Sequence, residues 1–242
     1  MGLDNFLFGV YPYIAGVVFI LGSWIRFDRE QYTWKADSSQ LLGNKGMVLA
    51  SNLFHVGIIG IFFGHAAGML LPHSWWQLIA TDVQHQYIAI YAGMLFGGMA
   101  AVGAALLFYR RMTNERVKAV SRLRDNFVVF WLLITALLGL NTIFGSLHHA
   151  QSGDVQTMLQ LAEYVKSIAT LSVDPALLTA AGGANFVDVS HTYKLHMLFG
   201  MTIFLVFPFT RLVHVWSVPL TYLMRPYQIM RRKRIKTQIG RA

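Results

Sequence analysis

Five long apolar stretches constrain this chain more than any other feature of its sequence. They cover roughly residues 6–25, 47–71, 87–109, 127–147 and 192–216. About 20 apolar residues are enough for one helix to cross the hydrocarbon core of a bilayer. Inside lipid the backbone must satisfy its own hydrogen bonds, which favours helices of this length. We therefore predict an all-α integral membrane protein, built as a bundle of five transmembrane helices.

The composition excludes several other classes of protein. The 242 residues are 55% hydrophobic and only 13% charged, whereas soluble domains carry about 25% charged residues. This balance argues against a soluble enzyme, a disordered tail and a nucleic-acid-binding module, despite a net charge of +9. Cysteine is absent, which removes disulfides, thiolate ligation of iron–sulfur clusters and the covalent attachment of c-type haem. The first apolar stretch lacks the flanks of a cleaved signal peptide, so we interpret it as a retained helix.

The basic residues predict the orientation of the bundle. Nearly all of the 20 Lys and Arg residues follow the first, third and fifth apolar stretches, whereas the connections around 72–86 and 148–191 hold only Lys166. Short cytoplasmic loops carry the excess of positive charge, so we expect the N-terminus outside and the C-terminus in the cytoplasm. The chain then divides into a membrane domain, 1–224, and a basic cytoplasmic tail, 225–242. The tail is typical of positive-inside anchoring to anionic lipid, and it could also dock a partner subunit.

The connection 148–191 is too long for a tight turn. Apolar residues recur there at helical spacing, and Asp154 is placed to cap such a helix. We expect an amphipathic helix that lies on the outer membrane surface, or one that packs on the outer end of the bundle. The apolar residues of this pattern are Val155, Met158, Leu159, Ala162, Val165, Ile168 and Ala169.

Four of the nine histidines lie inside predicted spans. His55 and His65 belong to the second stretch, and His196 and His214 to the fifth. Ionisable groups at such depth are rare, costly and usually functional, so we interpret these four as metal ligands. The other histidines fall at span ends or in outer loops, where no special role is required: His73, His85, His148, His149 and His191.

The spacing of the four histidines predicts two facing pairs. On a continuous helix His196 and His214 would share one face, about 27 Å apart, and Pro208 between them is expected to kink the helix. His55 and His65 would lie about 15 Å apart along their own helix. Because the two helices run in opposite directions, His55 meets His214 on the inner side of the membrane. His65 correspondingly meets His196 on the outer side.

Two opposed imidazoles are what a six-coordinate haem requires, whereas zinc or copper would need three or four ligands that converge on one point. We therefore predict two non-covalent b-type haems with irons about 20 Å apart. Such a pair would carry electrons across the membrane, with a lipid-soluble quinol as the natural donor. Any iron–sulfur relay must then reside in another chain. A non-redox membrane anchor or proton-relaying transporter is the alternative, although transporters more typically carry intramembrane acids or broken helices.

Small and charged residues near the histidines add weaker signals. Glycines at 60, 64 and 68, and again at 93 and 97, form rows with small-residue spacing, which indicate either close helix packing or clearance for a porphyrin or quinone ring. Arg211 lies one turn before His214, where it could contact a haem propionate or extend to the inner surface.

Longer runs of the sequence resemble one family, the gamma subunit (di-haem cytochrome b) of membrane-bound respiratory nitrate reductase. The resemblance covers nearly the whole chain and is weakest across 150–190 and in the extreme tail. The matching runs are Tyr11–Gly16 (YPYIAG), Gln31–Trp34 (QYTW), Ser51–His55 (SNLFH), Gly64–His65 and Phe207–Pro219 (FPFTRLVHVWSVP).

The resemblance implies that His55, His65, His196 and His214 are the axial haem ligands, in the pairs already derived. It also implies a quinol-oxidising site near the outer haem, at Gly64, His65 and the start of the third span. His85 stands here where the family's best-known example has a lysine, and a histidine could hydrogen-bond the quinol oxygen or accept its proton.

The family picture implies a bacterial inner-membrane subunit that oxidises menaquinol or ubiquinol at the outer face. Electrons would continue to an iron–sulfur beta subunit and then to a molybdenum-containing alpha subunit, where nitrate is reduced. Related cytochromes serve heterodisulfide-reductase-like and sulfite-reduction complexes, which is the alternative within the same class. The runs at 31–34 and 207–219 favour the nitrate reductase.

Overall fold

The structure, a computed structural model, describes residues 2–35, 42, 45–180 and 189–217. The described residues form helices and no strand, and five helical segments among them are long and apolar enough to cross a membrane. The predicted all-α bundle of five spans is therefore confirmed. The five segments are Leu3–Arg29, Gly46–Leu70, Asp82–Thr113, Leu123–Ser152 and His191–Phe209.

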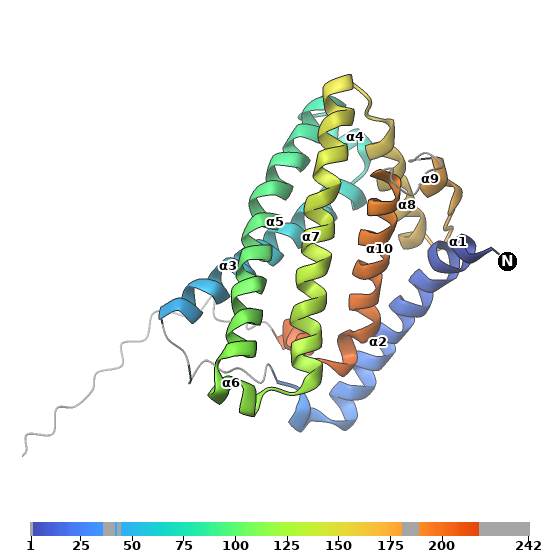
Figure 1. The fold of residues 1–242 in the computed structure, drawn as a ribbon. Helices are drawn as coiled ribbons and strands as arrows, with labels where there is room; N and C mark the ends of the chain where they lie inside the picture. The colour runs from blue at the N-terminus through green and yellow to red at the C-terminus, as the bar shows by residue number, and fades with distance from the viewer. Residues whose placement is uncertain (1, 36–41, 43–44, 181–188, 218–242) are drawn as a thin grey trace, which may run out of the picture.

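The elements follow one another along the chain as Figure 1 shows. The first span consists of α1 (Leu3–Asn5), the π-helix η1 (Phe6–Val10) and α2 (Tyr11–Arg29), with the 3-10 turn η2 (Gln31–Thr33) after it. The second is α3 (Lys45–His65) with the π-helix η4 (Ala66–Leu70), followed by α4 (His73–Trp76). The middle of the chain comprises α5 (Asp82–Thr113), α6 (Glu115–Val120), α7 (Leu123–Ser152), α8 (Gln156–Ala169) and α9 (Ala176–Ala180). The last span is α10 (Val189–Val206), with the 3-10 helices η5 (Phe207–Phe209) and η6 (Arg211–Ser217) after it.

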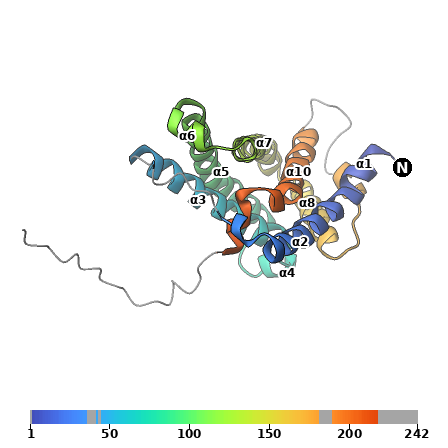
Figure 2. The same cartoon turned by 90° about the horizontal axis from the view of Figure 1, so that it is seen from below.

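The long helices pack in the order α3, α5, α7, α10 and α2, which Figure 2 shows as a curved row seen from below. The closest approach joins α3 to α5. A Cβ atom added at Gly57 would collide with the backbone of Ala100, and one at Gly103 with the backbone of Phe54. Gly60 lies directly against the ring of Phe96. These glycines bring the two backbones into contact, which is the packing role that small residues have in membrane bundles.

Polar side chains at the helix ends determine where several helices begin. Thr81 and Gln84 form a reciprocal capping box at the start of α5, and Asn114 Oδ1 accepts two backbone N–H groups at the start of α6. Asp154 Oδ1 accepts the N–H of Gln156 at 2.9 Å, so the predicted capping role of Asp154 at α8 is confirmed. Such caps satisfy amides that have no partner within the helix.

Two prolines leave helical carbonyl groups free, and aromatic side chains bind them. Pro12 cannot donate to Phe8 O, and the hydroxyl of Tyr164 donates to that carbonyl at 2.8 Å. Pro72 follows the π-helix η4 and cannot donate to Ala67 O, which accepts the indole N–H of Trp76 at 2.9 Å. The missing proline N–H is the physical reason in both cases. Both carbonyls lie in π-helices, which occur frequently at functional sites.

The helix α8 packs against the bundle. Tyr164 from α8 is buried with four other apolar or aromatic side chains from α8, α9, α10 and η1, in a cluster made of Phe8, Leu161, Tyr164, Leu178 and Tyr193. Figure 1 shows α8 beside the ends of the long helices, next to α9. Of the two arrangements that the sequence allowed, packing on the end of the bundle is the one observed.

The fifth span differs from its predicted bounds. The sequence predicts one span over 192–216 with a kink at Pro208, but the α-helix ends at Val206. Pro208 supplies no N–H, and Thr210 has an extended backbone with φ −122° and ψ −179°. The chain then resumes as the 3-10 helix η6, which carries His214. Because the helix is broken, counting helical turns between His196 and His214 does not give their relative orientation. The predicted basic tail, 225–242, lies outside the described residues.

Candidate haem and quinol sites

The rings of His65 and His196 face one another across the bundle. Their centroids are 6.0 Å apart and the ring planes are inclined by 36°. His65 is the last residue of α3, and His196 lies in the second turn of α10. These two helices are not neighbours in the packing order, so the two imidazoles approach from opposite sides.

A haem iron fits the separation of this pair. A bond between a metal and an imidazole nitrogen is about 2 Å long, and the ring centre lies about 1 Å beyond that nitrogen. Two imidazoles on opposite sides of one iron therefore have centroids about 6 Å apart. The observed separation matches this value. The chemistry of the donors is also suitable, because neutral imidazole is the commonest nitrogen ligand of iron in proteins.

All four candidate ligands share one hydrogen-bonding pattern. In each, Nδ1 lies within hydrogen-bond distance of a backbone carbonyl oxygen. The partners are Ser51 O for His55 at 2.7 Å, Ile61 O for His65 at 2.8 Å, Thr135 O for His196 at 3.0 Å and Arg211 O for His214 at 2.6 Å. A carbonyl oxygen only accepts, so Nδ1 carries the proton and donates it. The unprotonated Nε2 is then the free ligand atom, which is how metal-binding histidines are usually oriented.

The helix α7 forms the cradle of His196. A Cβ added at Gly139 would lie 2.8 Å from His196 Cε1, so only glycine leaves room for the ring in this position. Thr135, one turn earlier, supplies the carbonyl for Nδ1. On the same face Trp131 stacks on Phe199 with centroids 4.3 Å apart, and its indole donates to Phe199 O. These contacts hold α10 against α7 close to His196, and so they help to orient the His196 ring.

The inner pair is arranged differently. His55 lies in the middle of α3, and His214 lies in η6. Within the described part of the chain no ring contact joins these two histidines. Both are aligned by their own segment, since Ser51 and Arg211 supply the carbonyl groups three or four residues earlier in the chain. Their pairing stays a prediction.

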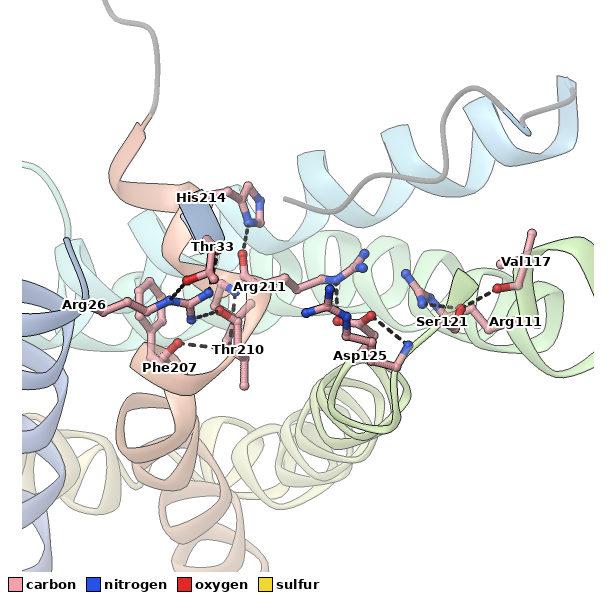
Figure 3. A network of polar contacts seen from close by, with 12 residues as sticks. Arg26, Thr33, Arg111, Val117, Ser121, Asp125, Phe207, Thr210, Arg211 and His214 are labelled. Carbon is pink, nitrogen blue, oxygen red and sulfur yellow. Dashed lines mark hydrogen bonds and ion pairs between the residues drawn. The ribbon is translucent and has the colours of Figure 1, made fainter. Parts of the chain in front are cut away.

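Arg211 forms an ion pair inside the protein. Its Nε lies 3.1 Å from Asp125 Oδ1, and Asp125 is only 2% exposed. Asp125 also accepts the backbone N–H of Arg122 at the start of α7. Figure 3 shows this carboxylate between Arg211 and the α7 terminus, with Arg111 bound to Ser121 nearby. The contact between Arg211 and a haem propionate stays a prediction.

The predicted quinol-site residues lie around the end of the second span. His85 lies in the first turn of α5, at the end of a span as the sequence predicts, and it is only 6% exposed. Its ring stacks on Trp76 with centroids 3.9 Å apart, and its Nδ1 is buried without a hydrogen-bond partner in the structure. A Cβ at Gly68 would lie 3.9 Å from His85 Nε2. Gly64 faces open space, because nothing lies within 4 Å of a Cβ built there.

Two of the remaining histidines form pairs with carboxylates. His149 Nδ1 lies 2.9 Å from Asp154 Oδ2, and His73 Nε2 lies 3.3 Å from Asp82 Oδ1. These histidines therefore differ from the four candidate ligands, whose Nδ1 atoms all bind carbonyl groups.

Sequence reasoning missed several residues that hold the candidate site. They include Gly139 and Thr135 on α7, Trp76 stacked on His85, and Asp125 in an ion pair with Arg211. Asp125 gave one usable signal, as an acid three residues after Arg122 at a helix start. The others depend on contacts between distant segments, which residue spacing cannot reveal.

The fold and the site define a class of protein, a helical membrane protein with histidines from separate helices that meet inside the bundle. Comparison with known proteins then gives the family. Residues 4–233 match the model of the nitrate reductase gamma subunit family. The chain belongs to this family, and it is a membrane subunit of an oxidoreductase complex.

Curated relatives are similar over nearly their full length. The Respiratory nitrate reductase 2 gamma chain of Escherichia coli (strain K12) is 46% identical over 96% of this chain and 98% of its own. The Respiratory nitrate reductase 1 gamma chain of the same organism is 44% identical over 95% and 97%. The Nitrate reductase gamma chain of Bacillus subtilis (strain 168) is 32% identical over 94% and 97%.

Proposed function

We propose that this chain is a di-haem b cytochrome that oxidises membrane quinol and delivers the electrons to the partner subunits of a respiratory nitrate reductase. The observation that carries this proposal is the shared orientation of four histidines. Each binds a backbone carbonyl through Nδ1, and two of them face one another at the spacing of a common iron. When bound, each haem would supply a one-electron iron centre.

The four histidines would hold the two haems. His65 and His196 would bind the outer one, and His55 and His214 the inner one. The carbonyl partners keep each Nδ1 protonated, which directs Nε2 at the metal and raises the basicity of the ligand. Arg211, whose Nε is held by Asp125, would lie close to a propionate of the inner haem.

His85 would act on the quinol. Its ring is held by Trp76 at one end of α5, and its buried Nδ1 has no protein partner in the structure. A buried polar atom without a partner is costly, and a quinol hydroxyl would satisfy it. The imidazole could accept the quinol proton through an unprotonated ring nitrogen. Gly64 would leave room for the ring of the quinol, either menaquinol or ubiquinol.

The orientation and the partners complete the proposal. The excess of basic residues near the ends of α2, α5 and η6 supports an orientation with these ends in the cytoplasm, which would put His65 near the outer face of a bacterial inner membrane. The electrons would leave on the cytoplasmic side, to an iron–sulfur beta subunit and a molybdenum-containing alpha subunit. The names of the relatives support an assembly of this kind.

Redox-difference spectroscopy on the purified complex tests the proposal. A quinol should produce the reduced bands of a low-spin haem b, and nitrate should then reoxidise them. A complex that contains no haem would exclude the cytochrome. A haem protein that quinol reduces and nitrate leaves reduced would point to a different terminal enzyme.

A further inference from the structure

The break after α10 brings two backbone carbonyl groups close to the first span. The α-helix ends at Val206, and the chain passes through Pro208 and the extended Thr210 before η6 begins. The carbonyl oxygens of Pro208 and Thr210, which follow this helix end, lie within hydrogen-bond distance of a side chain from the first span.

One arginine from the first span binds both carbonyls. Arg26 Nη1 donates to Pro208 O at 2.6 Å and to Thr210 O at 2.8 Å. Its Nη2 donates to Thr33 O at 2.7 Å, and its Nε lies 3.3 Å from Thr33 Oγ1. Figure 3 shows the guanidinium of Arg26 between Thr33 and Thr210, next to the segment that carries His214. A planar fork of several N–H donors makes such a set possible, and lysine does not have one.

The surrounding packing keeps the first span close to the break. A Cβ at Gly22 would lie 2.9 Å from Pro208 Cγ, so a larger residue there would push the two segments apart. Further along, the indole of Trp34 donates to Ser217 Oγ at 2.6 Å. The ends of η5 and η6 are therefore both held by the α2–η2 segment, and Arg26 lies between these two contacts.

The direction of His214 depends on this backbone. His214 Nδ1 donates to Arg211 O at 2.6 Å, and Arg211 directly follows Thr210, whose carbonyl Arg26 binds. The side chain of Arg211 is held from the opposite side, by Asp125 of α7. The first turn of η6 is therefore held at two points. The Arg26 guanidinium binds the backbone just before it, and the Asp125 carboxylate binds the side chain of Arg211.

We propose that Arg26 is a positioning residue for His214, and so for the inner haem; this inference rests on the proposed function. Arg26 binds the backbone on both sides of the break, and it thereby holds the segment whose next carbonyl, Arg211 O, orients the His214 imidazole. Loss of its guanidinium should change the geometry of the inner haem ligand and leave the outer pair, His65 and His196, unchanged.

The test uses the full chain in its native complex and compares Arg26→Gln, Arg26→Lys and the wild type. Arg29→Gln is the matched control, because Arg29 lies on the same helix, has the same charge and is exposed. Haem content, the low-spin EPR signals and the midpoint potential of each haem are measured. Reference spectra of His55→Ala and His65→Ala variants assign the signals to the inner and outer haem.

Arg26→Gln should shift the EPR signal and midpoint potential of the inner haem or lower its occupancy severalfold, with the outer haem unchanged. Arg26→Lys should give an intermediate effect, since an ammonium group can reach one of the two carbonyls. Inner-haem signals identical to those of Arg29→Gln would overturn the proposal. Equal loss of both haems in Arg26→Lys would also overturn the proposal, because it would show that Arg26 supports folding in general and does not position His214. A wild-type complex without haem would instead contradict the proposed function itself.

Discussion

The imidazoles of His65 and His196 lie with their ring centroids 6.0 Å apart, although they belong to helices that do not pack directly on one another. Each ring is aligned by a carbonyl oxygen at Nδ1, from Ile61 and from Thr135. Protein carbonyl groups alone orient both rings. The pair is therefore suited to act as the two axial ligands of one haem. The predictions below follow from this arrangement and from the contacts that maintain it.

Removal of either outer ligand should remove one haem. His65→Ala or His196→Ala should lower the haem content from two to one per chain and abolish quinol oxidation, because an iron needs both axial ligands to stay low-spin. Haem content is measured as the pyridine haemochrome. His73→Ala is the control, since His73 pairs with Asp82 instead of a carbonyl group. Quinol oxidation at the wild-type rate in His65→Ala would refute this assignment.

Gly139→Ala should disturb the outer haem through His196 alone. The new Cβ would lie 2.8 Å from His196 Cε1, so the ring must turn away from the Thr135 carbonyl. We expect a shifted midpoint potential or a reduced occupancy of the outer haem, with the inner haem unaffected. Gly200→Ala is the control on α10, because nothing lies within 4 Å of its Cβ position. Identical midpoint potentials of the outer haem in Gly139→Ala and Gly200→Ala would contradict the role of Gly139 in positioning His196.

The crossing of α3 and α5 should depend on glycine. Gly57→Ala and Gly103→Ala each place a Cβ against the backbone of the neighbouring helix. Separation of the two helices should cost about 1–3 kcal/mol, the usual penalty of overpacking, and lower the midpoint of thermal unfolding in detergent. Gly98→Ala, which meets nothing within 4 Å, should leave the midpoint unchanged. A midpoint for Gly57→Ala that equals the Gly98→Ala value would argue against close contact here.

Tyr164→Phe should destabilise the end of the bundle at which α8 packs. It leaves the buried Phe8 carbonyl without its donor, which costs about 1–2 kcal/mol. Burial raises the pKa of the Tyr164 hydroxyl, so the hydroxyl stays protonated in the folded chain. The stabilisation should therefore be constant below about pH 10, the ordinary pKa of tyrosine, and decline only above it. Thermal unfolding of both forms at about pH 7 and about pH 11, on either side of the ordinary tyrosine pKa, checks the prediction. Tyr32→Phe, at an exposed position, is the control.

The sequence predicts the spans well because membrane insertion depends on local hydrophobicity. All five apolar stretches are helical, and the candidate ligands His55, His65 and His196 lie within them. The end of the fifth span could not be predicted in the same way. Pro208 indicates a kink, but the sequence pattern does not indicate the extended backbone of Thr210 or the contacts of Arg26 with the carbonyls of Pro208 and Thr210.

The details of the candidate sites depend on contacts between distant segments. The environment of His85 is formed by Trp76 and by the π-helix η4, which a periodic pattern does not indicate. The cradle of His196 requires Gly139 to face it from another helix. Residue spacing identifies the groups capable of chemistry, whereas tertiary packing determines their direction and their partners.

The central claim is that four histidines hold two haems in this chain. Haem content combined with EPR spectroscopy of the oxidised, purified protein tests it most directly. The account predicts two b-type haems per chain, both low-spin, as six-coordinate iron with two imidazole ligands gives. A chain purified with its partner subunits that contains no haem, or only high-spin haem, would contradict the account.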